Sequence, residues 1–157
     1  MSEVSAAARG EDGFTLIEMV CVLAIVAILA AILMPRVSRQ TSRPRLEAYA
    51  IEAAAILKGD RTAAMKAGRQ IATSIDANLR SFRSGATGQA MQVADDVVVT
   101  ALLPERCNDR PALSTVSFFP NGMSCGGVIK LHRGEHGYEI RINWLTGGIE
   151  IVARGAS

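Results

Sequence analysis

The side chains of this 157-residue chain that could support chemistry are one carboxylate, three thiols and two histidines. Glu18 is the only acidic or basic residue in the apolar segment from 14 to 34, which reads FTLIEMVCVLAIVAILAAILM. Cys107 and Cys125 could pair as a disulfide, or join the histidines as metal ligands. The elements that hold these residues decide between these kinds of chemistry.

A metal site is not expected. His132 and His136 have the spacing of ligands on one helix, but the first closes a predicted strand and the second lies in a predicted turn. No nucleophile motif, phosphate loop or dinucleotide fingerprint occurs, so neither catalysis nor a cofactor is predicted. The net charge is only +2 and the basic residues are scattered, which argues against nucleic-acid binding.

The segment from 14 to 34 has the length and composition of a membrane-spanning helix. As an α-helix it would extend over about 31 Å, close to the thickness of a bilayer core. A carboxylate at the centre of such a segment costs about 2.5–3.5 kcal/mol, so Glu18 needs either water at the helix end or an oppositely charged partner. Glu18 is therefore a candidate functional residue.

Residues 13–18, Gly-Phe-Thr-Leu-Ile-Glu, resemble the type III signal of type IV pilins and type II secretion pseudopilins. The resemblance implies that a prepilin peptidase removes a leader, residues 1–13, by cutting after Gly13, and then methylates the amine of Phe14. It also implies that Glu18 pairs with the N-terminal amine of a neighbouring subunit during assembly. An ammonium and a carboxylate that neutralise each other in low dielectric cost less than either charge alone.

Taken alone, the charges beside the apolar segment predict that the C-terminal part of the chain lies in the cytoplasm. Arg36, Arg39, Arg43 and Arg45 follow it, the leader is acidic, and positive charge usually marks the cytoplasmic side. Because the type III signal requires a cytoplasmic leader, we expect a single-pass inner-membrane protein with its C-terminal part in the periplasm.

Thiols tend to pair in that compartment. A bridge between Cys107 and Cys125 would close a loop of about 19 residues and contribute roughly 3 kcal/mol. The alternative is two unpaired thiols. Cys21 lies in the apolar segment and is interpreted as a packing residue.

Helical periodicity continues beyond the apolar segment, so one helix is predicted from about 14 to 67 with an irregularity near Pro35. Its periplasmic half covers 35–67, and Gly68 is the predicted stop. The apolar positions at spacings of three and four, or their sum, are Leu46, Ala50, Ala53, Leu57 and Ala64.

From 68 to 157 the pattern predicts a periplasmic β domain, in an α+β, pilin-like fold with the long helix packed on an antiparallel sheet. A polar hairpin tip or mobile loop is expected at 80–90, and a loop at 104–111. In the strand from 138 to 144, Tyr138 and Trp144 are predicted to face the core, and Glu139 the solvent. The predicted strands are 71–75, 97–99, 115–119, 128–133, 138–144 and 149–152.

A second resemblance narrows the family. Residues 117–127, SFFPNGMSCGG, and 142–147, INWLTG, resemble the C-terminal signature of H-type minor pseudopilins, although Cys125 replaces the more usual serine. This implies a structural subunit at the tip of the type II secretion pseudopilus, which supports export of folded proteins across the outer membrane. The implied partners are other minor and major pseudopilins, the prepilin peptidase and the inner-membrane secretion platform.

Two alternatives stay open. A minor type IV pilin, of the fimbrial or DNA-uptake kind, would share the helix, and its neighbouring genes would separate it from a secretion component. A singly anchored periplasmic enzyme or ligand-binding domain would keep its function when the anchor is removed.

Overall fold

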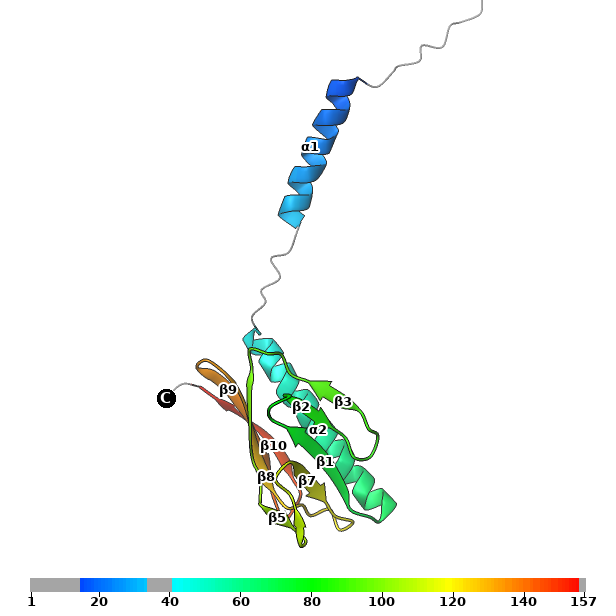
Figure 1. Cartoon of the computed structure of the whole chain (residues 1–157), viewed down its shortest axis with the longest axis vertical. Coiled ribbons are helices and arrows are strands. Elements are labelled where there is room, and N and C mark those ends of the chain that lie inside the picture. Colours follow the sequence, from blue (N-terminus) through cyan, green and yellow to red (C-terminus); the bar gives the residue numbers. More distant parts are fainter. Residues whose placement is uncertain (1–14, 34–40, 156–157) are drawn as a thin grey trace, which may run out of the picture. The chain divides into compact units, whose positions relative to one another are not determined.

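The computed structural model describes residues 15–33 and 41–155. The chain forms two units, Met1–Ser38 and Arg39–Ser157. The first contains helix α1 (Leu16–Leu33), and the second contains helix α2 (Arg43–Ala67) with all the strands (Figure 1).

Apart from Glu18 in its first turn, helix α1 is built from apolar residues around its circumference. Thr15 precedes its first turn, where the Glu18 amide donates to the Thr15 carbonyl at 3.1 Å and to its hydroxyl at 3.3 Å. Large apolar side chains such as Leu16 and Leu23 are exposed. Within the described residues, no helix meets the combined length and hydropathy expected of a membrane span.

The prediction of one helix from 14 to 67 is wrong at residues 41 and 42, which are not helical. Ser42 is extended, with φ −72° and ψ 159°, and α2 begins at the next residue. Pro44 explains this start, because proline is tolerated in a first helical turn and disfavours helix before it. Helix α2 ends at Gly68, whose φ of 63° confirms the predicted stop. Pro35 lies outside the described residues.

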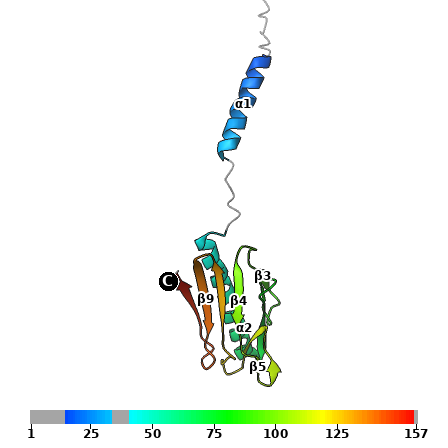
Figure 2. The same ribbon diagram turned by 60° about the vertical axis from the view of Figure 1, so that its left-hand side comes forward.

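The strands form two four-stranded antiparallel sheets, with orders β3-β2-β1-β7 and β10-β9-β8-β4, and a small hairpin β5-β6. Figure 2 shows the two large sheets side by side. The strands are β1 (Ile71–Asp76), β2 (Ser81–Arg83), β3 (Ala90–Gln92), β4 (Val98–Leu102), β5 (Arg106–Cys107), β6 (Arg110–Pro111), β7 (Thr115–Phe118), β8 (Gly127–Arg133), β9 (His136–Ile142) and β10 (Ile149–Arg154).

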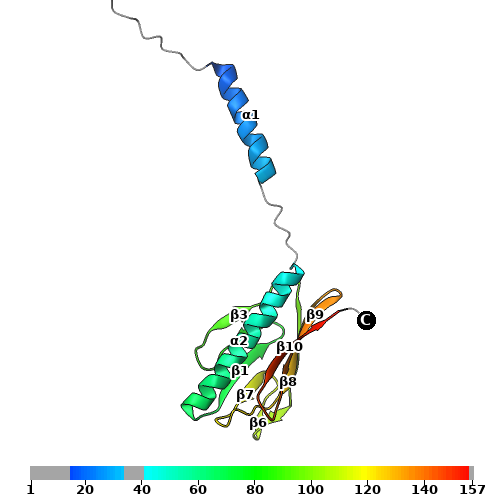
Figure 3. The same ribbon diagram turned by 180° about the vertical axis from the view of Figure 1, so that it is seen from behind.

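Helix α2 packs across both sheets and carries one side of their shared core (Figure 3). The five apolar positions predicted from its periodicity are all buried, which confirms the predicted stripe. Phe82 and Phe118 from the first sheet, and Ile129 and Ile140 from the second, meet this stripe and are fully buried. The α+β architecture, a helix packed on antiparallel sheets, is the predicted one.

Three local predictions differ from the structure. The loop expected at 104–111 contains the β5-β6 hairpin, whereas the stretch at 80–90, expected to be a hairpin tip or a mobile loop, belongs to the β2-β3 hairpin. Strand β9 ends at Ile142, so Trp144 is 62% exposed rather than in the core. Glu139, predicted to face solvent, has a side chain only 7% exposed.

Candidate functional site

The residues predicted to take part in processing and assembly lie at the start of the chain. Gly13 and Phe14 fall outside the described residues. Glu18 occupies the first turn of α1 with an exposed side chain. In residues 15–33 and 41–155, no side chain forms an ion pair with its carboxylate.

Cys107 and Cys125 are joined by a disulfide, with their Cα atoms 5.8 Å apart. The bridge links β5 to the segment between β7 and β8, where the Cys125 amide also donates to the Ser117 carbonyl at 3.2 Å. The third cysteine, Cys21, is free and exposed in α1.

The histidines are not brought together with the cysteines. His132 lies on β8 and His136 begins β9. In residues 15–33 and 41–155, no cluster of three or more His, Cys, Asp or Glu side chains has the arrangement of a metal site.

The two signature segments, 117–127 and 142–147, meet at one place, and Arg61 of α2 joins them. Its Nε donates to the Gly122 carbonyl at 3.0 Å and its Nη2 to the Thr146 carbonyl at 3.0 Å. Gly147 has φ 63°, and a Cβ there would lie 2.0 Å from the Gly122 carbonyl oxygen. Only glycine fits such an approach. No sequence pattern identified Arg61 as the residue that connects these turns.

The turn after β9 is held by Asn143. Its Oδ1 accepts from the amides of Leu145 at 2.9 Å and Thr146 at 3.0 Å, and its carbonyl accepts from the Gly147 amide at 2.8 Å. The Trp144 carbonyl accepts from the Ser124 amide at 3.0 Å. The backbone of this turn is therefore fixed, while the side chains of Trp144 and Leu145 are exposed.

Asp60 is a buried carboxylate on α2, 1% exposed, that the sequence analysis did not single out. It accepts from the hydroxyls of Thr73, at 2.7 Å, and Ser84, and from the amides of Gly85, at 2.9 Å, and Ala86, at 3.2 Å. Its spacing from the apolar stripe of α2 was the signal that could have identified it as buried. It ties the β2-β3 connection to the helix.

A second carboxylate, Asp96, holds the start of the larger unit. The amide and the hydroxyl of Thr41 both donate to it at 2.6 Å, and Arg133 pairs with it at 2.8 Å. Arg133 also donates to the Thr41 carbonyl at 2.8 Å. The hydrogen bonds from Thr41, and then the charge of Arg133, lower the pKa of Asp96 against the opposing effect of desolvation.

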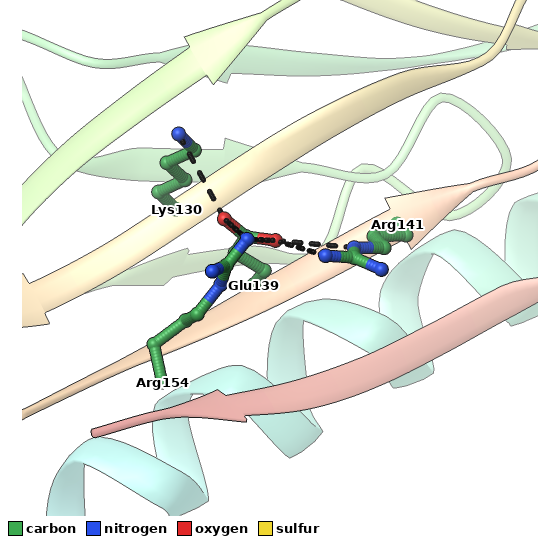
Figure 4. A network of polar contacts seen from close by, with 4 residues as sticks. All are labelled: Lys130, Glu139, Arg141 and Arg154. Carbon is green, nitrogen blue, oxygen red and sulfur yellow. Dashed lines mark hydrogen bonds and ion pairs between the residues drawn. The ribbon is translucent and has the colours of Figure 1, made fainter. Parts of the chain in front are cut away.

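Glu139 is the centre of a cluster of cations on the second sheet (Figure 4). Its Oε2 accepts from Arg141 at 2.9 and 3.1 Å, and its Oε1 lies 3.1 Å from Arg154 and 3.7 Å from Lys130. The hydrogen bond from Arg141, followed by that from Arg154, lowers the pKa of Glu139, while burial acts in the opposite direction. The aliphatic stems of these long side chains cover Glu139, which explains why it is buried on a face predicted to be exposed to solvent.

Comparison with known proteins bears on both units. A family model described as the prokaryotic N-terminal methylation motif matches residues 8–34. Among curated protein sequences, none matches this chain.

Two solved structures share the fold of the larger unit. The minor pseudopilin EpsH from the type 2 secretion system of Vibrio cholerae is 11% identical, with a TM-score of 0.55 over 69% of this chain and 96% of that one. The type IV minor pilin FimU of Pseudomonas aeruginosa is 16% identical, with a TM-score of 0.54 over 71% of this chain and 91% of that one. The chain therefore has an α+β, pilin-like fold and carries an N-terminal methylation motif.

Proposed function

We propose that this chain is a minor pseudopilin, a structural subunit at the tip of the type II secretion pseudopilus that supports export of folded proteins across the outer membrane. The observation that carries the proposal is the combination of a methylation motif over 8–34 with a pilin-like fold in the rest of the chain. The chain would be anchored in the inner membrane by residues 14–34, and its role would be structural rather than enzymatic.

In this proposal prepilin peptidase cuts after Gly13 and methylates Phe14. The helix then packs among those of other minor and major pseudopilins on the inner-membrane secretion platform. Glu18 neutralises the N-terminal amine of a neighbouring subunit, and its exposed position in the first turn of α1 is compatible with this role.

A periplasmic location for residues 68–157 is supported by the Cys107–Cys125 disulfide. Disulfides persist in the bacterial periplasm and are rare in the cytoplasm, where thiols are kept reduced. This outweighs the arginines that follow the apolar segment, because the positive-inside rule describes an average bias.

The second candidate function is that of a minor type IV pilin. It is favoured by one observation, namely that FimU matches the fold as well as EpsH does. Deleting the gene separates the two candidates. Loss of protein export with surface fibres intact would support the secretion role, and loss of fibres with export intact would support the pilus role.

The experiment that tests processing is the intact mass of the protein isolated from membranes, with and without a co-expressed prepilin peptidase. We expect loss of Met1–Gly13 and gain of one methyl group only when the peptidase is present. The variant Gly13→Leu should remain full-length, because a bulky side chain at the cleavage site obstructs the peptidase. An unprocessed wild-type chain in both samples would overturn the proposal.

A further inference from the structure

The outer face of the sheet β10-β9-β8-β4 is the side turned away from α2. Side chains alternate between the two faces of each strand, and Ile129, Leu131 and Ile140 point into the core shared with α2. The residues between them therefore point outward. Register places Lys130 opposite Glu139, and Arg141 between Val128 and Glu150.

One half of this face is basic. Lys130, Arg141 and Arg154 share the single buried carboxylate of Glu139, yet their own side chains remain 42%, 47% and 59% exposed. Three cations against the two carboxylates of this face, Glu139 and Glu150, leave a surplus of one positive charge, and each arginine has more N–H donors than Glu139 can accept. Glu139 fixes the positions of the three cations, and their side chains remain accessible to a partner (Figure 4).

The other half exposes apolar side chains beside Arg141 and Glu150. Leu102 lies opposite Val128 on the neighbouring strand and is 57% exposed. Trp144 follows β9 on the turn fixed by Asn143 and is 62% exposed. Val128, Arg141 and Trp144 line a hollow of about 360 Å³ at this end of the sheet.

The combination fits a partner of definite chemistry. Tryptophan and arginine are the residue types that most often dominate binding energy at protein interfaces. Glu150 borders the hollow on the far side and would repel an acid placed there. A partner carboxylate is therefore favoured beside Lys130 and Arg154, and an apolar side chain beside Trp144.

We infer that this face, consisting of Lys130, Arg141, Arg154, Leu102, Val128 and Trp144, docks an extended acidic segment of another subunit, with an apolar side chain of that segment in the hollow beside Trp144. The inference rests on the proposed function only in taking the partner to be an assembly subunit. Beyond that function, the inference specifies which surface of this chain binds the partner and the chemistry of the bound segment.

Trp144 is the only tryptophan in the chain, so its fluorescence reports directly on this face. The experiment titrates the full-length protein, in a non-ionic detergent, with a synthetic peptide of alternating leucine and aspartate. A matched peptide carries asparagine in place of every aspartate. We expect the acidic peptide to shift Trp144 emission to the blue and to bind about tenfold more tightly than its amide counterpart, with affinity falling as salt is added.

Variants separate recognition from folding. The double variant K130Q/R154Q should bind the acidic peptide about tenfold more weakly, and K130R/R154K should retain much of the affinity because the charge is kept. Arg69→Gln, at an exposed arginine outside the face, is the matched control and should bind like wild type.

Equal affinity for the two peptides, or unchanged affinity in K130Q/R154Q, would overturn the inference. A shift with vesicles of anionic lipid but not with the acidic peptide would also overturn it and assign the face to a membrane surface. Peptide binding does not depend on leader cleavage. The docking inference can therefore fail while the processing experiment succeeds, and processing can fail while the peptide binds.

Discussion

At the residue scale, Asp60 is a polar side chain whose loss should cost much stability. It is a buried carboxylate that accepts hydrogen bonds from two hydroxyls and two amides. A buried donor left without an acceptor costs about 1–3 kcal/mol. We expect Asp60→Ala to lower the free energy of unfolding by about 3 kcal/mol or more, measured by urea denaturation followed by Trp144 fluorescence.

The matched control is Asp95→Asn. Asp95 pairs with Arg80 at the surface with its side chain 91% exposed, and exposed pairs of this kind contribute about 0–1 kcal/mol. Its denaturation midpoint should stay close to that of wild type. If Asp60→Ala shifted the midpoint no more than Asp95→Asn, the cluster around Asp60 would have no structural importance.

At the scale of elements, Asp96 connects Thr41, two residues before α2, to the loop that precedes β4 and, through Arg133, to the end of β8. Because folding lowers the pKa of Asp96, its stabilising contribution is complete above its unfolded value of about 4 and is lost as the pH falls through the folded value. We expect Thr41→Ala, which removes the main hydrogen bond to Asp96, to destabilise the protein at neutral pH. That loss should shrink at pH values below about 4.

Urea midpoints of wild type and Thr41→Ala, measured from neutral pH to below about pH 4, test this expectation. Thr41→Ser is the control, since it keeps the hydroxyl donor and should follow the pH dependence of wild type. A difference between wild type and Thr41→Ala that is the same at every pH would mean that the ionised state of Asp96 does not contribute.

The elements that sequence predicted well are those governed by local pattern. The apolar stripe of α2 and its end at Gly68 depend on helical period and on one glycine, and both are confirmed. Strand β2 was missed because Phe82 is its only buried residue and gives no alternation to detect. The end of β9 was misplaced because Trp144 continues the apolar alternation beyond Ile142, although Asn143 turns the chain there.

The candidate site was harder to predict because its contacts join residues far apart in sequence. Arg61 reaches two turns that lie 61 and 85 residues further along the chain. Alternation assigned Glu139 to the outer face of its strand, and its side chain does point to that face. It is buried there because Lys130 and Arg154 from neighbouring strands cover it. Alternation identifies the face of a strand and cannot reveal which long side chains cover it.

At the scale of the whole molecule, the two units divide the proposed work. The unit with α1 carries the methylation motif and an exposed carboxylate, Glu18. The larger unit carries a rigid fold on which Glu139 holds three cations in place. Anchoring and packing would belong to the first unit, and recognition of neighbouring subunits to the second.

Assembly gives the test of Glu18. In a low-dielectric helix bundle, an ammonium left without its carboxylate costs several kcal/mol, so pairing in the assembly depends on this one side chain. We expect Glu18→Ala to be cleaved and methylated like wild type, but to be recovered with the major subunit about tenfold less after cross-linking in membranes.

The matched control is Met19→Ala, which makes the same substitution at the adjacent exposed position of α1. It removes packing surface without removing charge, so its recovery should stay much closer to that of wild type. Equal recovery of Glu18→Ala and wild type would exclude the pairing role, whereas equal losses in both variants would mean that packing of α1, and not charge, determines incorporation. A specific loss with Glu18→Ala would assign the only charge of the apolar segment to contact between subunits.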